Sequence, residues 1–243
     1  VGATENGPQP VNLRVGEVSG NTLTMRLQEL EYLDGRHVFE TVNYIVVEAG
    51  VWTLEDGTIF EAGQLNTGIL SPQGFETVEF QSDFDDAPLV FSQVQTFNGS
   101  DFVTTRQRNT SQDGFQITMQ EEEARNDWHT TETIGWLAVE AGSGTSGDLS
   151  WWAGQVSGVN HTNSALPPTG GFDGDINAIA MLSSFAGNNT AWVRGDDGVD
   201  GFEFSIEEER SRDNETWHLP ELVDVFVFDT TGTLSGFEVD LLL

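Results

Sequence analysis

The chain of 243 residues is 37% hydrophobic and 10% aromatic, which is enough apolar material for a packed core and too much for a disordered chain. Forty acidic residues face nine basic ones, all of them arginine, and the net charge is −31. Such a charge repels nucleic-acid phosphates and anionic lipids, so we expect no nucleic-acid partner. No apolar stretch approaches the roughly 18 residues of a membrane span, so we expect no membrane insertion.

The acidic residues run along the whole chain instead of forming one patch. At about 1 M salt the screening length is only ~3 Å, so like charges tolerate one another while the carboxylates keep the surface hydrated. Strong acidity without lysine resembles the residue usage of haloarchaea. We therefore predict a protein of a haloarchaeon or of a haloarchaeal virus.

Five Asn-x-Ser/Thr sequons predict a glycoprotein that lies outside the cell. They begin at Asn98, Asn109, Asn160, Asn188 and Asn214. There is no cysteine, which removes disulfides and thiol chemistry. The chain begins with valine and shows no signal peptide, so we expect it to be processed or to be cut from something longer. The predicted location is the cell surface, a surface appendage or a virion.

One phrase occurs three times. "HVFETVNYIVVEAG" begins at His37, "HTTETIGWLAVEAG" begins at His129, and the related "HLPELVDVFVFD" begins at His218. The three histidines are therefore 92 and 89 residues apart. A repeat of about 90 residues is the size of a domain and larger than a solenoid rung.

Each unit is predicted to be β structure. Residues 115–121 alternate apolar and polar side chains, which is typical of a half-buried strand, and 23–29 and 202–208 keep this alternation. Further strands are predicted at 58–66, 77–80, 88–97, 103–109 and 132–141. Asn98-Gly99 and Asp113-Gly114 favour hairpin turns between strands. The sequence predicts an all-β fold of tandem six-stranded antiparallel β-sandwich repeats.

The first repeat is incomplete. We divide the chain into a partial sandwich at 1–57, a complete one at 58–142, a Gly/Ser-rich linker at 143–150, a second sandwich at 151–235 and a C-terminal strand at 236–243. A half-sandwich leaves open edges and an exposed core. We therefore expect the first repeat to be completed by a donated strand, from the C-terminal segment of this chain or from a neighbour.

Three segments resemble the H-type lectin domain of snail agglutinins and discoidins: "FDDAPLVFSQVQTF" at 84–97, "DGFQITM" at 113–119 and "IGWLAVE" at 134–140. The resemblance covers 75–142 best, 172–229 weakly and 11–50 in part. It implies a six-stranded antiparallel sandwich, often trimeric, that binds galactose-type sugars in the groove between protomers.

In that family an Arg on the strand before the Gly-Phe strand holds the sugar, together with aromatic and His residues after it. Arg106 or Arg108 matches the Arg, but the aromatic and His positions fall near Glu122 and Glu123. Galactosamine-type specificity is therefore not supported. The glycan-binding candidates are Arg106, Arg108, Trp128, His129, Arg194, Trp217 and His218. A tryptophan can stack on a sugar face, and the alternative is that it packs against its own domain.

A second set of polar residues recurs in every unit. It comprises Arg14, Glu29, His37, Glu40, Glu121, Glu132, Glu208 and Glu221, with the Arg and His residues of the other units. Such residues could ligate a metal or act as an acid–base pair, or they could form a buried hydrogen-bonded network. Because the set recurs even in the incomplete unit, we interpret it as structural.

The acidic runs 120–127 and 206–215 could bind Ca²⁺, but no Asp-x-Asp-x-Asp-Gly loop is present and a solvated halophilic surface explains them. We expect no cofactor and no metal. No nucleophile motif, phosphate loop or HExxH motif occurs, so an enzyme is not expected. Two functions remain. One is a lectin-like adhesin that binds glycans or surface glycoproteins, and the other is a self-associating subunit of a surface filament or virion appendage.

Overall fold

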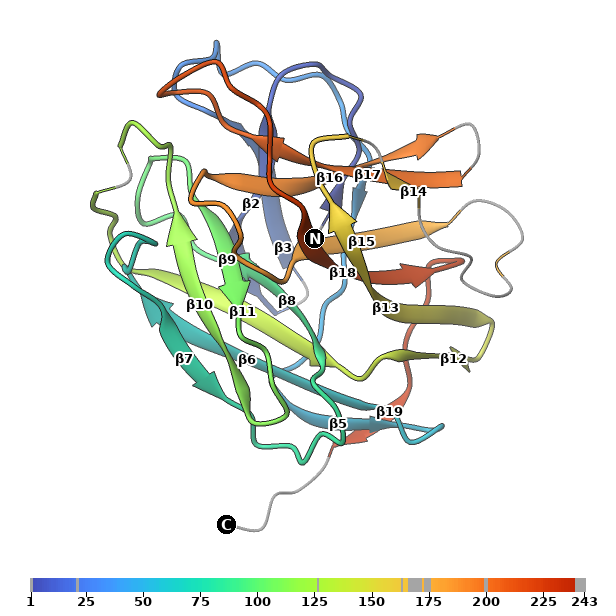
Figure 1. Cartoon of the computed structure of the whole chain (residues 1–243). Helices are drawn as coiled ribbons and strands as arrows, with labels where there is room; N and C mark the ends of the chain where they lie inside the picture. The colour runs from blue at the N-terminus through green and yellow to red at the C-terminus, as the bar shows by residue number, and fades with distance from the viewer. Residues whose placement is uncertain are drawn as a thin grey trace.

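The computed structural model describes residues 2–20, 22–125, 127–162, 164–165, 172, 176–198 and 201–238. This part of the chain forms antiparallel strands (Figure 1). Among the described residues there is no helix, and hence none long and apolar enough to cross a membrane. The predicted all-β class is confirmed.

The second unit is a β-sandwich. Its strands are β5 (Gly50–Leu54), β6 (Ile59–Thr67), β7 (Glu76–Glu79), β8 (Leu89–Val94), β9 (Thr104–Arg108), β10 (Gly114–Gln120) and β11 (Glu132–Val139). One sheet has the order β5-β6-β11-β8 and the other β7-β10-β9. Phe115, Ile117 and Met119 of β10 are buried between the sheets beside Trp136, as the alternation at 115–121 predicts. The Trp136 ring lies directly over Gly63, where a Cβ atom would clash at 2.4 Å.

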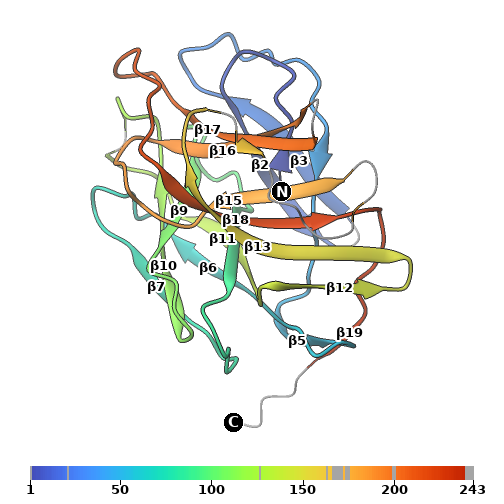
Figure 2. The same cartoon turned by 45° about the vertical axis from the view of Figure 1, so that its right-hand side comes forward.

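The third unit repeats this arrangement. Its strands are β12 (Gly142–Ser146), β13 (Leu149–Val159), β14 (Ser164–Ala165), β15 (Asn177–Leu182), β16 (Ala191–Gly198), β17 (Gly201–Glu208) and β18 (Glu221–Phe228). The sheets are β12-β13-β18-β15 (Figure 2) and β14-β17-β16 (Figure 1). The predicted linker at 143–150 is wrong, because it forms β12 and the start of β13. Gly147, with φ +59°, makes the tight turn between them.

The first unit has only part of the sandwich. β2 (Val11–Ser19) pairs with β3 (Thr22–Glu29), and β1 (Gly2–Ala3) pairs with β4 (Val42–Asn43). Val38, Phe39, Tyr44 and Val46 remain exposed. The predicted boundary at residue 57 is wrong, because β5 pairs with β6 and so belongs to the sheet of the second unit.

The predicted C-terminal strand forms as β19 (Gly236–Glu238). It pairs with β5, with Phe237 opposite Thr53, and so adds an edge strand to the second unit. It does not pair with β2 or β3, as a donated strand for residues 11–50 would. Residues 239–243 of this segment lie outside the described part of the chain.

A central apolar core joins the units. Phe60 of β6 meets Trp151 of β13 and Phe226 of β18, with both ring centroids at 6.1 Å, and Trp151 stacks on Phe226 at 5.7 Å. Ile45 of the first unit and Trp52 of β5 pack against this cluster. The units therefore form one packed body, with buried aromatic side chains between them.

Candidate functional site

The recurring arginines are buried and reach across to the next unit. Three ion pairs result, from Nη2 to Oε1: Arg14–Glu132 at 2.7 Å, Arg106–Glu221 at 2.6 Å and Arg194–Glu40 at 3.2 Å. The first unit therefore contacts the second, the second contacts the third, and the third contacts the first. These contacts close a ring within one chain.

Each recurring histidine bridges two glutamates. His37 lies 3.1 Å from Glu29 through Nδ1 and 2.8 Å from Glu40 through Nε2. His218 lies 2.5 Å from Glu208 through Nδ1 and 3.0 Å from Glu221 through Nε2. His129 contacts Glu121 through Nδ1 and Glu132 through Nε2, the latter at 3.2 Å. Each site is thus a continuous Arg–Glu–His–Glu chain whose side chains are nearly all out of contact with solvent.

All the residues proposed for the structural network meet in these three sites. The sequence did not show that the arginine of each site comes from another unit. The spacing between arginine and histidine along the chain would be the same if each arginine contacted its own unit. The sequence also did not show which backbone N–H groups donate to the glutamates. Glu132 accepts the N–H of Asn98 at 3.0 Å and of Gly99 at 2.9 Å, as well as the Thr96 hydroxyl at 2.5 Å. The recurrence of Asn-Gly at 6–7 and 98–99 was the available signal.

Hydrogen bonds and charge set the protonation states. Burial alone would raise the pKa of Glu132 and Glu221, but hydrogen bonds and the facing arginine lower it below its usual range. Burial alone would lower the pKa of His129 and His218, but the two glutamates beside each ring raise it above the ordinary value. The sites of His129 and His218 therefore favour an imidazolium beside the glutamates.

A second set of contacts between units surrounds the acidic run after β10. Glu31 N–H donates to Glu122, and Glu123 N–H donates to Glu209 Oε1 at 2.7 Å. Burial and the neighbouring Glu209 raise the pKa of Glu122 and Glu123 to about 7. This run therefore lies at a unit boundary and is not simply a solvated surface.

These shifts predict that the protein is more stable at pH 5.5 than at pH 8.5. The folded-state pKa values of Glu122 and Glu123 are raised, so their contribution to stability is lost as the pH rises through about 7. The pKa values of His129 and His218 are raised above the ordinary value of 6.5, so their contribution is present below that value and is lost at higher pH. The lowered pKa of Glu132 and Glu221 acts oppositely and matters only as the pH falls below about 4.5. Thermal melts in molar salt across this range test the prediction, and a higher melting temperature at pH 8.5 would contradict it.

Several residues proposed to bind glycans are inaccessible. Arg106, Arg194, His129 and His218 are at most 4% exposed and belong to the buried network, so we do not assign them to a ligand. Arg108 lies over the Phe75 ring at 3.7 Å.

Two proposed residues do face solvent. Trp128 is 70% exposed and Trp217 is 57% exposed. Trp128 lies on the loop after β10 and Trp217 on the loop after β17. Each directly precedes a buried histidine. The Trp217 ring lies 6.2 Å from that of His161.

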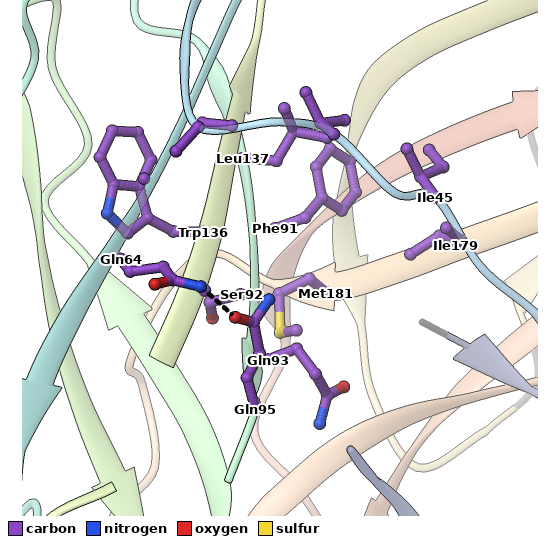
Figure 3. Close-up of a pocket in the computed structure, with 15 residues that line it drawn as sticks. Ile45, Gln64, Phe91, Ser92, Gln93, Gln95, Trp136, Leu137, Ile179 and Met181 are labelled. Atoms are coloured by element: carbon purple, nitrogen blue, oxygen red, sulfur yellow. Dashed lines mark hydrogen bonds between the residues drawn. The ribbon is translucent and has the colours of Figure 1, made fainter. Parts of the chain in front are cut away.

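A pocket of about 130 Å³ opens beside β11 (Figure 3). Gln64, Gln93 and Gln95 supply its polar side, and Ile45 and Met181 lie on its apolar side. Gln64 Nε2 donates to Gln95 Oε1 at 2.7 Å, and Gln93 Nε2 donates to the Leu13 carbonyl at 3.0 Å. The amides are thus already partly satisfied by protein groups.

The third unit shows why this pocket is open. There, Asp224 of β18 accepts the N–H of Val90 of β8 at 2.9 Å and Gln155 Nε2 at 2.8 Å. The β8 strand of the second unit thus covers the sheet of the third unit at the position that corresponds to the pocket. In the first unit the strand that corresponds to β8 is β1, which has two residues instead of six. The pocket reflects the incomplete first unit, and we do not interpret it as a ligand site.

The sequons are mostly accessible. Asn98, Asn109, Asn188 and Asn214 are exposed, and Asn160 is partly buried. Whether they carry glycans stays a prediction. Among the described residues, no group of three or more His, Asp or Glu side chains is arranged to hold a metal ion.

Comparison with known proteins gives one informative relative. The chain is 28% identical over 228 residues to halomucin of Haloquadratum walsbyi, which is 92% of this chain and spans only 2% of that protein. No protein-family model matches the chain, and no solved structure matches it. The match supports a haloarchaeal origin, while the H-type lectin resemblance stays a prediction.

Proposed function

We propose that this chain is a non-enzymatic, extracellular module of a halophile surface protein that binds glycans through Trp128 and Trp217. The similarity to a protein named halomucin supports the surface location and the halophilic setting. The net charge of −31 supports the same setting.

The observation that carries the glycan proposal is the exposure of the two tryptophans. A large exposed apolar ring is unfavourably hydrated unless it packs against a partner. An indole face stacks well on the apolar face of a sugar. Each indole is adjacent to a histidine locked between two glutamates. The loops are therefore anchored at one end, which lowers the entropy lost on binding.

A glycan array in molar salt, followed by titration of any bound glycan, tests this proposal. Trp128→Ala and Trp217→Ala are expected to weaken binding by about tenfold each, which corresponds to a loss of ~1.4 kcal/mol. Phe39→Ala is the matched control, because Phe39 is 98% exposed on the equivalent loop of the first unit. Absence of binding, or binding that survives loss of both tryptophans, would contradict the proposal.

A second candidate function is a structural subunit of a surface filament or virion appendage. The first unit exposes four large apolar side chains, Val38, Phe39, Tyr44 and Val46, and this favours it, because exposed apolar surface is what a contact between subunits would bury. Light scattering at high protein concentration in molar salt separates the two functions. Growth into long assemblies would support the filament, and a constant monomer mass would exclude it.

A further inference from the structure

Asparagine followed by glycine occurs twice in the chain, at positions 6–7 and 98–99 of corresponding loops. Such a pair is chemically labile. The glycine nitrogen loses its proton and attacks the side-chain amide carbon of the asparagine, so that a nitrogen–carbon bond forms and ammonia leaves with the proton. Water then opens the resulting cyclic imide to aspartate or isoaspartate. Glycine favours this reaction because it has no side chain to hinder the approach.

The buried network occupies both glycine nitrogens. Gly7 N–H donates to Glu40 Oε1 at 3.2 Å, and Gly99 N–H donates to Glu132 Oε1 at 2.9 Å. The N–H of the preceding asparagine donates to the same carboxylate, at 2.8 Å in the first unit and at 3.0 Å in the second. Both glutamate side chains are 0% exposed. A glycine nitrogen that lost its proton here would place a second negative charge beside a buried carboxylate, which is strongly unfavourable.

The histidines of the network pack against the two loops. A Cβ atom at Gly99 would lie 2.8 Å from Cε1 of His129, and one at Gly7 would lie 3.1 Å from Cε1 of His37. The two asparagines, by contrast, are exposed to water. Attack of the glycine nitrogen on the amide carbon therefore requires movement of a loop that is packed against a ring and hydrogen-bonded along its backbone.

The third unit shows that this turn requires the glycine and not the asparagine. Its corresponding loop reads Ala186-Gly187, and the backbone of Ala186 is hydrogen-bonded to Glu221. A Cβ atom at Gly187 would lie 3.3 Å from Cε1 of His218. Alanine can thus replace asparagine in the turn, which supplies an unreactive variant for each of the other two loops.

We propose that Asn6 and Asn98 are deamidation sites, which Glu40 and Glu132 hold unreactive while the ring of units is closed. Opening of a unit boundary frees the glycine N–H and lets the loop move, so the reaction follows the local opening of each site. Isoaspartate adds a carbon atom to the backbone between the two N–H groups that the glutamate binds, so that the closed geometry is not regained. Neither exposed tryptophan takes part, and the inference is independent of the glycan proposal.

Peptide mapping by mass spectrometry tests the proposal on the whole chain, produced without N-glycosylation because Asn98 also begins a sequon. The folded chain and two synthetic peptides, covering 2–10 and 94–102, are incubated in molar salt at the same mildly alkaline pH. Asn6→Ala and Asn98→Ala identify the signal of each site. We expect both asparagines to react at least about tenfold more slowly in the folded chain than in the peptides, because the reaction needs a prior opening. A folded chain that deamidates at the peptide rate would overturn the proposal.

Two reciprocal variants test the role of the glutamates. The side chain in Glu132→Gln has one oxygen in place of two and no negative charge, so it cannot accept both N–H groups of the loop as the carboxylate does. We expect Asn98 to deamidate several-fold faster in this variant, while Asn6 of the same molecule keeps its native rate. Glu40→Gln is expected to show the reverse. Each variant thus contains its own control.

The other outcomes contradict the proposal. Equal acceleration of both sites in a folded variant would mean that overall unfolding, and not the local glutamate, controls the reaction. Unchanged rates in both variants would mean that the glutamates do not protect the loops. If a variant fails to fold, hydrogen exchange of the Gly7 and Gly99 N–H groups in the native chain decides instead. Slow exchange at both is expected, and exchange at the rate of an unprotected amide would overturn the proposal.

Discussion

Replacing Arg106 by methionine is expected to destabilise the protein by about 3–5 kcal/mol, because it removes the guanidinium partner of the buried Glu221 carboxylate and leaves only His218 beside it. Arg106 is fully buried and donates to Glu221 at 2.6 Å, to Gln120 at 3.1 Å and to the carbonyls of Ser184 and Asn189 at 3.3 Å. Three of these partners belong to the third unit. The substitution therefore acts on the contact between units as well as on the second unit itself.

Denaturant unfolding in molar salt measures this effect. Arg108→Met is the matched control, because Arg108 is partly exposed and stacks on Phe75, and its loss is expected to cost about 0.5–1 kcal/mol. The double variant Arg106→Met/Glu221→Gln is expected to recover part of the loss, since a neutral amide no longer needs the cation. Similar costs for the two single variants would show that the Arg106–Glu221 pair contributes little.

The strand pattern could be predicted from the sequence wherever the alternation was clear. Residues 115–121 were expected to form a strand with Phe115, Ile117 and Met119 inward, and β10 does so. Alternation succeeds there because the apolar residues of one face fill the core between the sheets. The strand is not half-buried as predicted, because Thr118 and Gln120 on the other face are buried too. The same reasoning identified the incomplete first unit, since 11–50 hold only the last part of the repeated pattern.

Other features depended on contacts between units, which sequence spacing does not reveal. The Gly/Ser-rich stretch 143–150 has the composition of a linker, yet it forms a hairpin because β13 and Trp151 hold it against the central core. Arg14, Arg106 and Arg194 recur at corresponding positions of the three repeats, and this recurrence identified the network. Its direction, from each unit into the next, required the three-dimensional arrangement. For the same reason, the sequence could not show that Arg106 and Arg194, which it offers as glycan-binding candidates, are buried in this network.

The protein is also expected to unfold, or to melt at a much lower temperature, when salt falls from molar to about 0.01 M. Across that range the screening length grows from ~3 to ~30 Å, so carboxylates over the whole surface begin to repel one another. Three of the nine basic residues, Arg14, Arg106 and Arg194, are buried in ion pairs with glutamates, so these pairs leave the net charge of the surface unchanged. The repulsion then opposes a net stability of only ~5–15 kcal/mol.

Thermal melts in sodium chloride test this, but chloride at molar concentration also changes apolar hydration, so screening must be separated from that effect. A charge-reduced variant does so. Asp85→Asn/Asp86→Asn/Glu215→Gln removes three exposed negative charges at sites that lie outside the buried network. If repulsion drives the loss, the variant should keep its fold to lower salt than the native protein, while both melt alike above 2 M, where screening is already complete within a few ångströms.

A native melting temperature that does not change with salt would refute the halophilic interpretation of the charge. A native protein that loses stability in parallel with its charge-reduced variant would assign the salt dependence to apolar burial in the central core.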